Sequence, residues 1–222
     1  MEHMTRVAIV GAHGKVAQQL MGLLYDRGDD FVGIVRTSDH AEDVYRLGGE
    51  GILLDIEHAR VSELAAAFSG SDVIVFSAGA GSGSGVERKH TVDFAGSVVS
   101  AAAAVAAGVR RFIQVSAMGV DSPVDADADP QWAAYVTAKR DADASLRESG
   151  LDWTILRPGA LTSEPPTGRI TLDTSVPRGT ISRADVAAVI VATIDEPRSG
   201  GHTWEFVSGT EPIPEAIARR LA

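Results

Sequence analysis

The 222-residue chain contains no cysteine, few aromatic residues (5%) and no uninterrupted apolar run of the roughly 20 residues that a membrane span needs. Without cysteine, the chain has no disulfide, no thiolate zinc site and no cysteine nucleophile, which fits a reducing cytoplasm. The first residues lack the basic and apolar segments of a signal peptide. We therefore expect a cytoplasmic protein without a membrane partner.

Positive charge is also scarce, since 20 Lys and Arg residues face 30 Asp and Glu residues and the formal net charge is −10. This balance argues against nucleic acid as a partner, but it leaves room for a small anionic ligand at a local positive site. The length suits one domain, and 45% apolar content is enough for a buried core. We expect a single domain over residues 1–222 that binds a small-molecule substrate, as a monomer or homodimer.

Short apolar runs alternate with helical patterns along most of the chain. The runs are nearly continuous, which is typical of strands buried on both faces. Alternation of strands and helices predicts an α/β fold with a doubly wound, Rossmann-type parallel sheet. The expected strands are Val7–Val10, Phe31–Val35, Gly51–Leu54, Val73–Phe76, Arg111–Val115 and Trp153–Leu156. The expected helices are Val16–Asp26, His40–Leu47, Val61–Phe68, Val86–Ala107 and Gln131–Ser149.

The residues after Leu161 are too few for a separate substrate domain of typical size. Their pattern predicts two strands and two helices, at Arg169–Leu172, Ser182–Ile194, Thr203–Val207 and Pro214–Leu221 in chain order. We expect residues 162–222 to form a small C-terminal cap on the substrate side of the sheet.

The first strand runs directly into a glycine turn, in which Gly11, Gly14 and Ala17 have the spacing G-x-x-G-x-x-A. A dinucleotide site needs the first glycine for a sharp turn, the second for close approach of the pyrophosphate, and a small third residue for helix packing. The N–H groups that open the next helix then face the phosphates. An ordinary strand-to-helix turn is the alternative, but the position near the N-terminus favours a dinucleotide site.

The end of the second strand bears on which dinucleotide binds. An NAD site usually carries an acidic residue there, whereas this chain has Arg36 followed by Thr37. A guanidinium suits a 2′-phosphate, so we expect NADP(H) to be preferred over NAD(H). The alternative for a strand-end arginine is a solvated side chain. Asp55 is expected to accept from adenine or to cap a turn, with Ile56 packed on the ring.

A catalytic set is predicted at the carboxyl end of the fifth strand. Ser116 ends that strand, and Tyr135 and Lys139 follow at i and i+4 of the next helix, on one face. The lysine charge is expected to lower the tyrosine pKa, so that Tyr135 exchanges a proton with a carbonyl or alcohol oxygen while Ser116 bonds that oxygen. A surface pair is the alternative. The histidines lack metal-ligand spacing, so no metal is expected.

These motifs, together with Arg157-Pro158-Gly159, resemble the short-chain dehydrogenase/reductase superfamily. Within it the chain is similar to the atypical NAD(P)H-binding group, related to biliverdin-IXβ/flavin reductases and to epimerase/dehydratase-like proteins. The resemblance implies an NADPH-dependent oxidoreductase that transfers hydride to a small carbonyl, quinone or flavin-like acceptor. The alternatives are a non-catalytic NADP(H)-binding redox sensor and a sugar epimerase/dehydratase-like enzyme.

The complete expectation for the site comprises three catalytic residues and a larger cofactor-binding set. The predicted catalytic residues are Ser116, Tyr135 and Lys139. The predicted cofactor-binding residues are Gly11, Ala12, His13, Gly14, Lys15, Val16, Arg36, Thr37, Asp55, Ile56, Ser77, Ala78, Gly79, Ser116, Lys139, Pro158 and Gly159. The loop Gly79–Gly85 is interpreted either as a plain linker or as a mobile lid.

Overall fold

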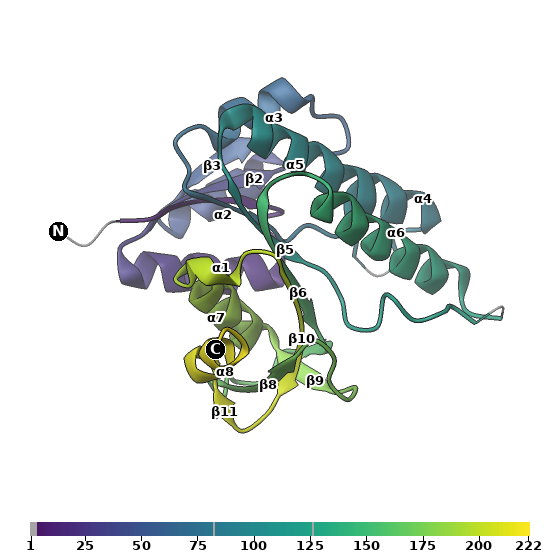
Figure 1. The fold of residues 1–222 in the computed structure, drawn as a ribbon. Helices are drawn as coiled ribbons and strands as arrows, with labels where there is room; N and C mark the ends of the chain where they lie inside the picture. The colour runs from purple at the N-terminus through teal and green to yellow at the C-terminus, as the bar shows by residue number, and fades with distance from the viewer. Residues whose placement is uncertain (1–3, 82, 126) are drawn as a thin grey trace.

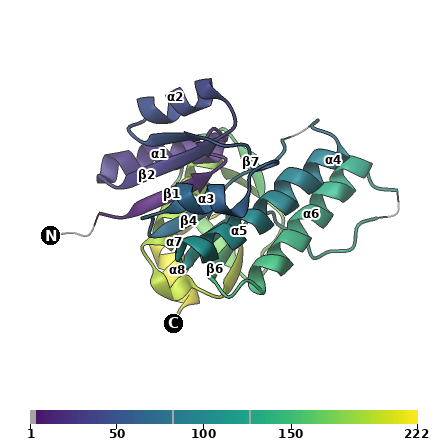
Figure 2. The ribbon, with the colours of Figure 1, turned by 90° about the horizontal axis from the view of Figure 1, so that it is seen from above.

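A nine-stranded sheet lies between two layers of helices in the computed structural model, which describes residues 4–81, 83–125 and 127–222 (Figures 1 and 2). Ser82 of the expected lid and Ala126 of the loop before the sixth helix lie outside the described residues. From β10 to β3 all neighbouring strands are parallel, whereas β8 is antiparallel to β10 and β11 to β8. The predicted α/β fold with a parallel Rossmann-type sheet is confirmed.

The strands stand in the order β11-β8-β10-β6-β5-β4-β1-β2-β3. Their bounds are β1 Arg6–Val10, β2 Asp30–Val35, β3 Glu50–Leu53, β4 Val73–Phe76, β5 Arg111–Val115, β6 Asp152–Pro158, β8 Arg169–Asp173, β10 His202–Ser208 and β11 Glu211–Pro212. A separate two-stranded sheet pairs β7, Ala160–Thr162, with β9, Thr180–Ser182.

The helices divide between the two faces of the sheet, as Figure 1 shows for α1, α7 and α8 below it and α3, α5 and α6 above it. The bounds are α1 Lys15–Arg27, α2 Ser38–Arg46, α3 Val61–Phe68, α4 Val86–Arg88, α5 Gly96–Ala107, α6 Pro130–Arg147, α7 Arg183–Ile194 and α8 Ile213–Arg220. A short 3₁₀ turn, η2, covers Pro197–Ser199.

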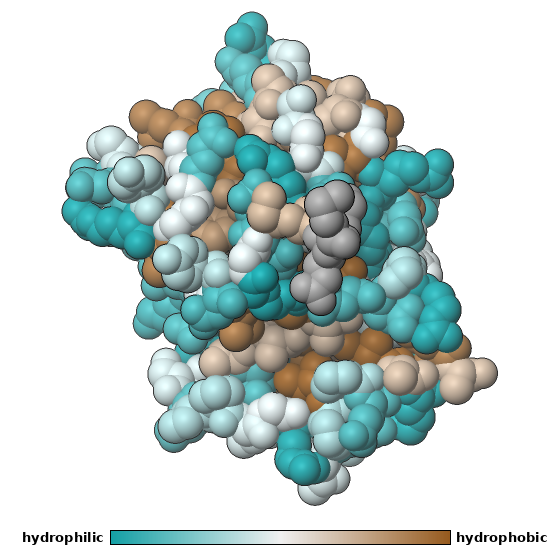
Figure 3. Space-filling view, turned by 90° about the vertical axis from the view of Figure 1, so that its left-hand side faces the viewer, coloured by the Kyte–Doolittle hydropathy of each residue, from teal (hydrophilic) through white to brown (hydrophobic). Residues whose placement is uncertain are grey.

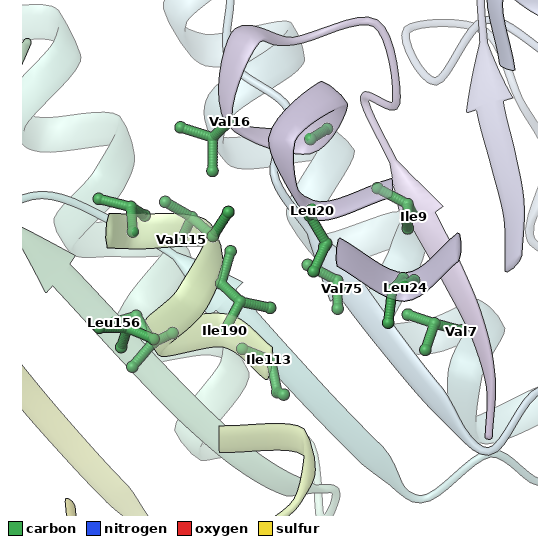
Figure 4. Close-up of a cluster of buried hydrophobic side chains, with 14 of the residues drawn as sticks. Val7, Ile9, Val16, Leu20, Leu24, Val75, Ile113, Val115, Leu156 and Ile190 are labelled. Atoms are coloured by element: carbon green, nitrogen blue, oxygen red, sulfur yellow. The ribbon is translucent and has the colours of Figure 1, made fainter. Parts of the chain in front are cut away.

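Two apolar clusters fill the spaces between the sheet and its helices. Strand β1 contributes to both, because Val7 and Ile9 point to one face while Ala8 and Val10 point to the other. The first cluster packs beneath α1 and α7 (Figure 4), and the second beneath α3 and α5. Burial on both faces explains why the strand sequences are continuously apolar rather than alternating.

The expected helix 86–107 is interrupted in its first half. A π-helical segment, η1, covers Lys89–Ala95 between α4 and α5. Such segments occur often at functional sites, because they rotate side chains relative to a regular helix. By length and composition alone 86–107 would suffice to cross a membrane, but in the structure it packs against α3 and α6.

The C-terminal residues contribute to the main sheet as well as to the expected cap. Strand β10 pairs with β6 inside the sheet, and its Trp204 and Phe206 are fully buried. Helix α7 packs against α1 on one face. The pair β7–β9 forms a separate small sheet directly after the end of β6. The face around the first described residues is largely hydrophilic, with apolar patches between (Figure 3).

Candidate active site

The glycine turn sits at the carboxyl end of β1, in the left-handed backbone region at Gly11 with φ of 82°. A Cβ at this position would lie 2.6 Å from the Cα of Ala78, so any larger residue would push β4 away. Gly14 is the N-cap of α1 and offers no side chain to the first-turn N–H groups. Those N–H groups remain available to an anion, which is the arrangement that a pyrophosphate needs.

A smaller cavity of about 240 Å³ opens beside this turn. It has the position of an adenosine site, because it lies at the ends of β1, β2 and β3 at the carboxyl edge of the sheet. Of the predicted cofactor-binding residues, it is lined by Gly11, His13, Gly14, Arg36, Asp55, Ile56, Ser77, Ala78 and Gly79. Arg36 is exposed, and within the described part of the chain it forms no ion pair or hydrogen bond.

Asp55 lines the smaller cavity, and its Oδ1 accepts from the N–H of Glu57 at 3.1 Å, as in the turn that was one of its two expected roles. Glu57 and Arg88 are among the residues of this wall that sequence reasoning missed. Glu57 accepts from Arg88 at 2.7 Å and from the Thr91 hydroxyl at 2.6 Å. The hydrogen bond from Arg88 holds the pKa of Glu57 below its usual value. This pair ties α4 to the end of β3.

A larger cavity of about 780 Å³ continues from the smaller one, since Gly14, Ser77, Ala78 and Gly79 line both. It brings together all three predicted catalytic residues with Pro158 from the end of β6. Its remaining lining comes chiefly from the glycine turn, η1, α6 and the start of α7: Lys15, Val16, Lys89, Asp93, Asp129, Gln131, Trp132, Leu161 and Arg183. This volume is sufficient for a nicotinamide riboside and a small acceptor.

Lys139 is buried against η1, where its Nζ lies 3.3 Å from Asp93 Oδ1 and donates to the Val115 carbonyl at 3.1 Å. Burial alone would lower the pKa of Lys139, but Asp93, Tyr135 and Asp143 together outweigh it and the pKa is raised. Asp93 in turn accepts from the N–H of Ala80 at 3.0 Å. The lysine is therefore a fixed cation beside Tyr135.

The expected fall in the tyrosine pKa is wrong for this arrangement. Burial raises the pKa of Tyr135; the nearby Lys139 lowers it in part, while Asp93 and Asp143 add to the rise. The spacing of Tyr135 and Lys139 in the sequence gave no sign that the charge of Lys139 is shared with Asp93. Tyr135 is consequently a protonated phenol at neutral pH, suited to give a proton rather than to take one.

The role expected of Ser116 also needs correction. Its Oγ donates to Asp143 Oδ2 at 2.9 Å, so in this state its proton does not face a substrate oxygen. The fully buried Asp143 accepts further hydrogen bonds from Gln114 at 2.7 Å and from Arg157 Nε at 2.9 Å. Burial raises the pKa of Asp143, opposed by Arg157 and these hydrogen bonds. The Ser116 oxygen thus presents acceptor lone pairs to the cavity.

Three predicted residues line neither cavity. Ala12 is fully buried in the core, and Thr37 is the N-cap of α2. Gly159 is small for a packing reason, because a Cβ there would meet the Gly179 carbonyl and Val207. Within residues 4–81, 83–125 and 127–222, no group of three carboxylate or imidazole side chains is placed to hold a metal.

A Rossmann-type sheet, a glycine turn with open N–H groups and a cleft across the carboxyl edge define a dinucleotide-binding protein. The family model for NAD(P)H-binding proteins matches residues 11–197. The chain belongs to this NAD(P)H-binding family, as its resemblance to the NAD(P)H-binding group predicted.

Three relatives illustrate the family. The chain is 35% identical over 219 residues to the "uncharacterized sugar epimerase YhfK" of Bacillus subtilis, covering 96% of this chain and 99% of the relative. The solved oxidoreductase YlbE of Lactococcus lactis is 29% identical, with 98% and 97% coverage and a TM-score of 0.86. The anaerobillin reductase ChuY of Escherichia coli O157:H7 is 25% identical, with 92% and 97% coverage and a TM-score of 0.77.

Proposed function

We propose that the protein is an NADPH-dependent reductase that transfers hydride to a small carbonyl, quinone or flavin-like acceptor. The observation that carries the proposal is the placement of Tyr135, Lys139 and Ser116 on the wall of the larger cavity, which is continuous with a phosphate-binding turn. The reductase and oxidoreductase names of two structural relatives agree with it.

The cofactor fits the residues present, because Gly14, as the N-cap of α1, places no side-chain cap on the first-turn N–H groups that would meet the pyrophosphate. When bound, it supplies a hydride to the acceptor carbon. Tyr135 supplies a proton to the acceptor oxygen, so that the hydride and this proton together add two electrons and two protons across the double bond. Lys139 stabilises the tyrosinate that remains, since it is held beside Tyr135 by Asp93 and the Val115 carbonyl. Water then restores the proton.

The direct test titrates the protein with NADPH and NADH and then measures oxidation of NADPH in the presence of quinones, flavins and small aldehydes. We expect Tyr135→Phe to lose about 100-fold or more in turnover, the usual contribution of a general acid, without a change in NADPH affinity. Tyr25→Phe is the matched control, because Tyr25 is 63% exposed and lines neither cavity. Full turnover by Tyr135→Phe would assign the proton donor elsewhere.

The preference for NADPH rests on Arg36, an exposed cation on the wall of the smaller cavity. A charge-assisted hydrogen bond to a phosphate is worth about tenfold or more in affinity. We therefore expect Arg36→Ala to weaken NADPH binding at least that much and to leave NADH binding nearly unchanged in a fluorescence titration. Equal losses for the two dinucleotides would contradict the assignment.

A redox sensor that binds NADP(H) without turnover is the second candidate, and one observation favours it. The Ser116 proton is committed to Asp143, and the Lys139 charge is shared with Asp93. A sensor would bind NADPH tightly and show no oxidation with any acceptor, so the titration and the acceptor screen distinguish the two functions.

A further inference from the structure

Two histidines meet on the wall of the smaller cavity next to Arg36. His13 belongs to the glycine turn and His40 to the first turn of α2, so they come from different elements. Their rings stack with centroids 3.5 Å apart and an interplanar angle of 9°. The stacked imidazoles line the same cavity as Arg36.

The charges around this pair come from α2 and from the end of β2. His13 Nε2 lies 3.2 Å from Asp43 Oδ2, and the other oxygen of Asp43 accepts from Arg46 at 3.0 Å. Burial lowers the pKa of His40, the charges of His13 and Arg36 lower it further, and Asp43 and Asp39 act in the opposite direction. His13, His40 and Arg36 thus place up to three positive charges on one cavity wall, partly balanced by Asp43 and Asp39, and a bound anion would favour the protonated form of His40.

The place of His13, His40 and Arg36 in the fold indicates which anion would bind. In a doubly wound sheet the adenosine ribose lies at the carboxyl end of β2, and NADP(H) differs from NAD(H) there by a 2′-phosphate. We infer that His13, His40 and Arg36 together form a 2′-phosphate subsite, in which His40 takes up a proton when NADPH binds. The inference rests on the proposed NADPH preference and adds to it two ligands and a pH dependence.

The proton balance separates this subsite from a simple arginine contact. A phosphate monoester has a second pKa of about 6, so at neutral pH its binding to a cationic site releases a small amount of proton. Proton uptake by His40 has the opposite sign. The affinity for NADPH relative to NADH should therefore rise as the pH falls from about 8.5 towards 6.5, where histidine becomes charged.

The experiment is isothermal titration calorimetry with NADPH and NADH, at about pH 7.5, in buffers of different ionisation enthalpy. We expect net proton uptake with NADPH and none with NADH.

His40→Asn should abolish the uptake and weaken NADPH binding about tenfold near pH 6.5, the value of one charge-assisted contact. His40→Lys should restore NADPH affinity without its pH dependence. His90→Asn is the control, because His90 is exposed and lines neither cavity.

The outcomes also separate this inference from the proposed function. Tight NADPH binding with the same proton uptake in wild type and His40→Asn, or with net proton release in both, would overturn the subsite and leave the NADPH-dependent reductase intact. Failure of the wild type to bind either dinucleotide would overturn both. A His13→Asn variant that keeps the full preference for NADPH at every pH would remove His13 from the subsite.

Discussion

At the scale of single residues, Asp143 is a fully buried carboxylate that accepts hydrogen bonds from Gln114, Ser116 and Arg157. Its charge is stable in the core only while these partners are present. Breaking a buried charge pair costs about 3–5 kcal/mol, since the remaining charge stays desolvated. Arg157 also pairs with Asp121, so the cost should lie near the lower value. We expect Asp143→Asn to lower the free energy of unfolding by about 3 kcal/mol in urea denaturation.

Asp121→Asn is the matched control for that prediction. It removes the other partner of Arg157, but the Asp121 side chain is 63% exposed while that of Arg157 is 5% exposed. Exposed pairs contribute about 0.2–1 kcal/mol, so a small loss is expected. Equal losses for the two variants would contradict the prediction, because they would mean that burial does not make the Asp143–Arg157 pair more costly to break than the exposed Asp121–Arg157 pair.

Residue identity was predictable from sequence where one backbone requirement dictates one residue. Gly11 is such a case, because its φ of 82° and the contact with Ala78 both exclude a side chain. Asp93 and Asp143 were missed because their roles depend on contacts between elements. A signal for Asp143 was present, since Tyr135, Lys139 and Asp143 repeat at i, i+4 and i+8 on one face of α6.

At the scale of elements, alternation of apolar runs and helices predicted every parallel strand of the sheet. Most of these strands are buried on both faces, which leaves a clear apolar run in the sequence, whereas the edge strand β3 is partly exposed. The π-helical segment Lys89–Ala95 was not predicted, because the sequence pattern 86–107 indicated one continuous helix. It nevertheless shapes the site, because it brings Lys89 and Asp93 to the larger cavity. Lys89 also donates to the Gly81 carbonyl at 2.5 Å, which fixes the start of the glycine-rich loop.

For the C-terminal elements, the sequence predicted a strand but not its place in the sheet. The strand near Thr203–Val207 was predicted, but its place between β6 and β8 was not, because local sequence does not specify which strands pair. The match of the family model to residues 11–197 reaches through α7 and ends before β10. The sheet is therefore completed by two strands, β10 and β11, that follow the matched region.

At the scale of the whole molecule, an excess of ten negative charges sets how stability responds to acid. Protonation of unpaired carboxylates relieves repulsion, whereas protonation of paired carboxylates removes ion pairs. Hydrogen bonds from arginine lower the pKa of Glu57 and Asp121, and the pKa of Glu63 falls to about 2. Asp143 acts in the opposite direction, because burial raises its pKa.

Glu57 makes the acid response testable, because its pKa is lowered mainly by the hydrogen bond from Arg88. Its contribution to stability is present above the unfolded value of about 4.3 and is lost as the pH falls through the lower folded pKa. Arg88 is 32% exposed, so we expect Glu57→Gln to cost only about 1 kcal/mol at neutral pH. The unfolding free energies of variant and wild type should then converge in acid.

Glu87→Gln, on exposed Glu87, makes the same chemical change and should track the wild type throughout. A constant difference between Glu57→Gln and wild type down to about pH 2 would show that Glu57 stabilises the fold by packing rather than by charge.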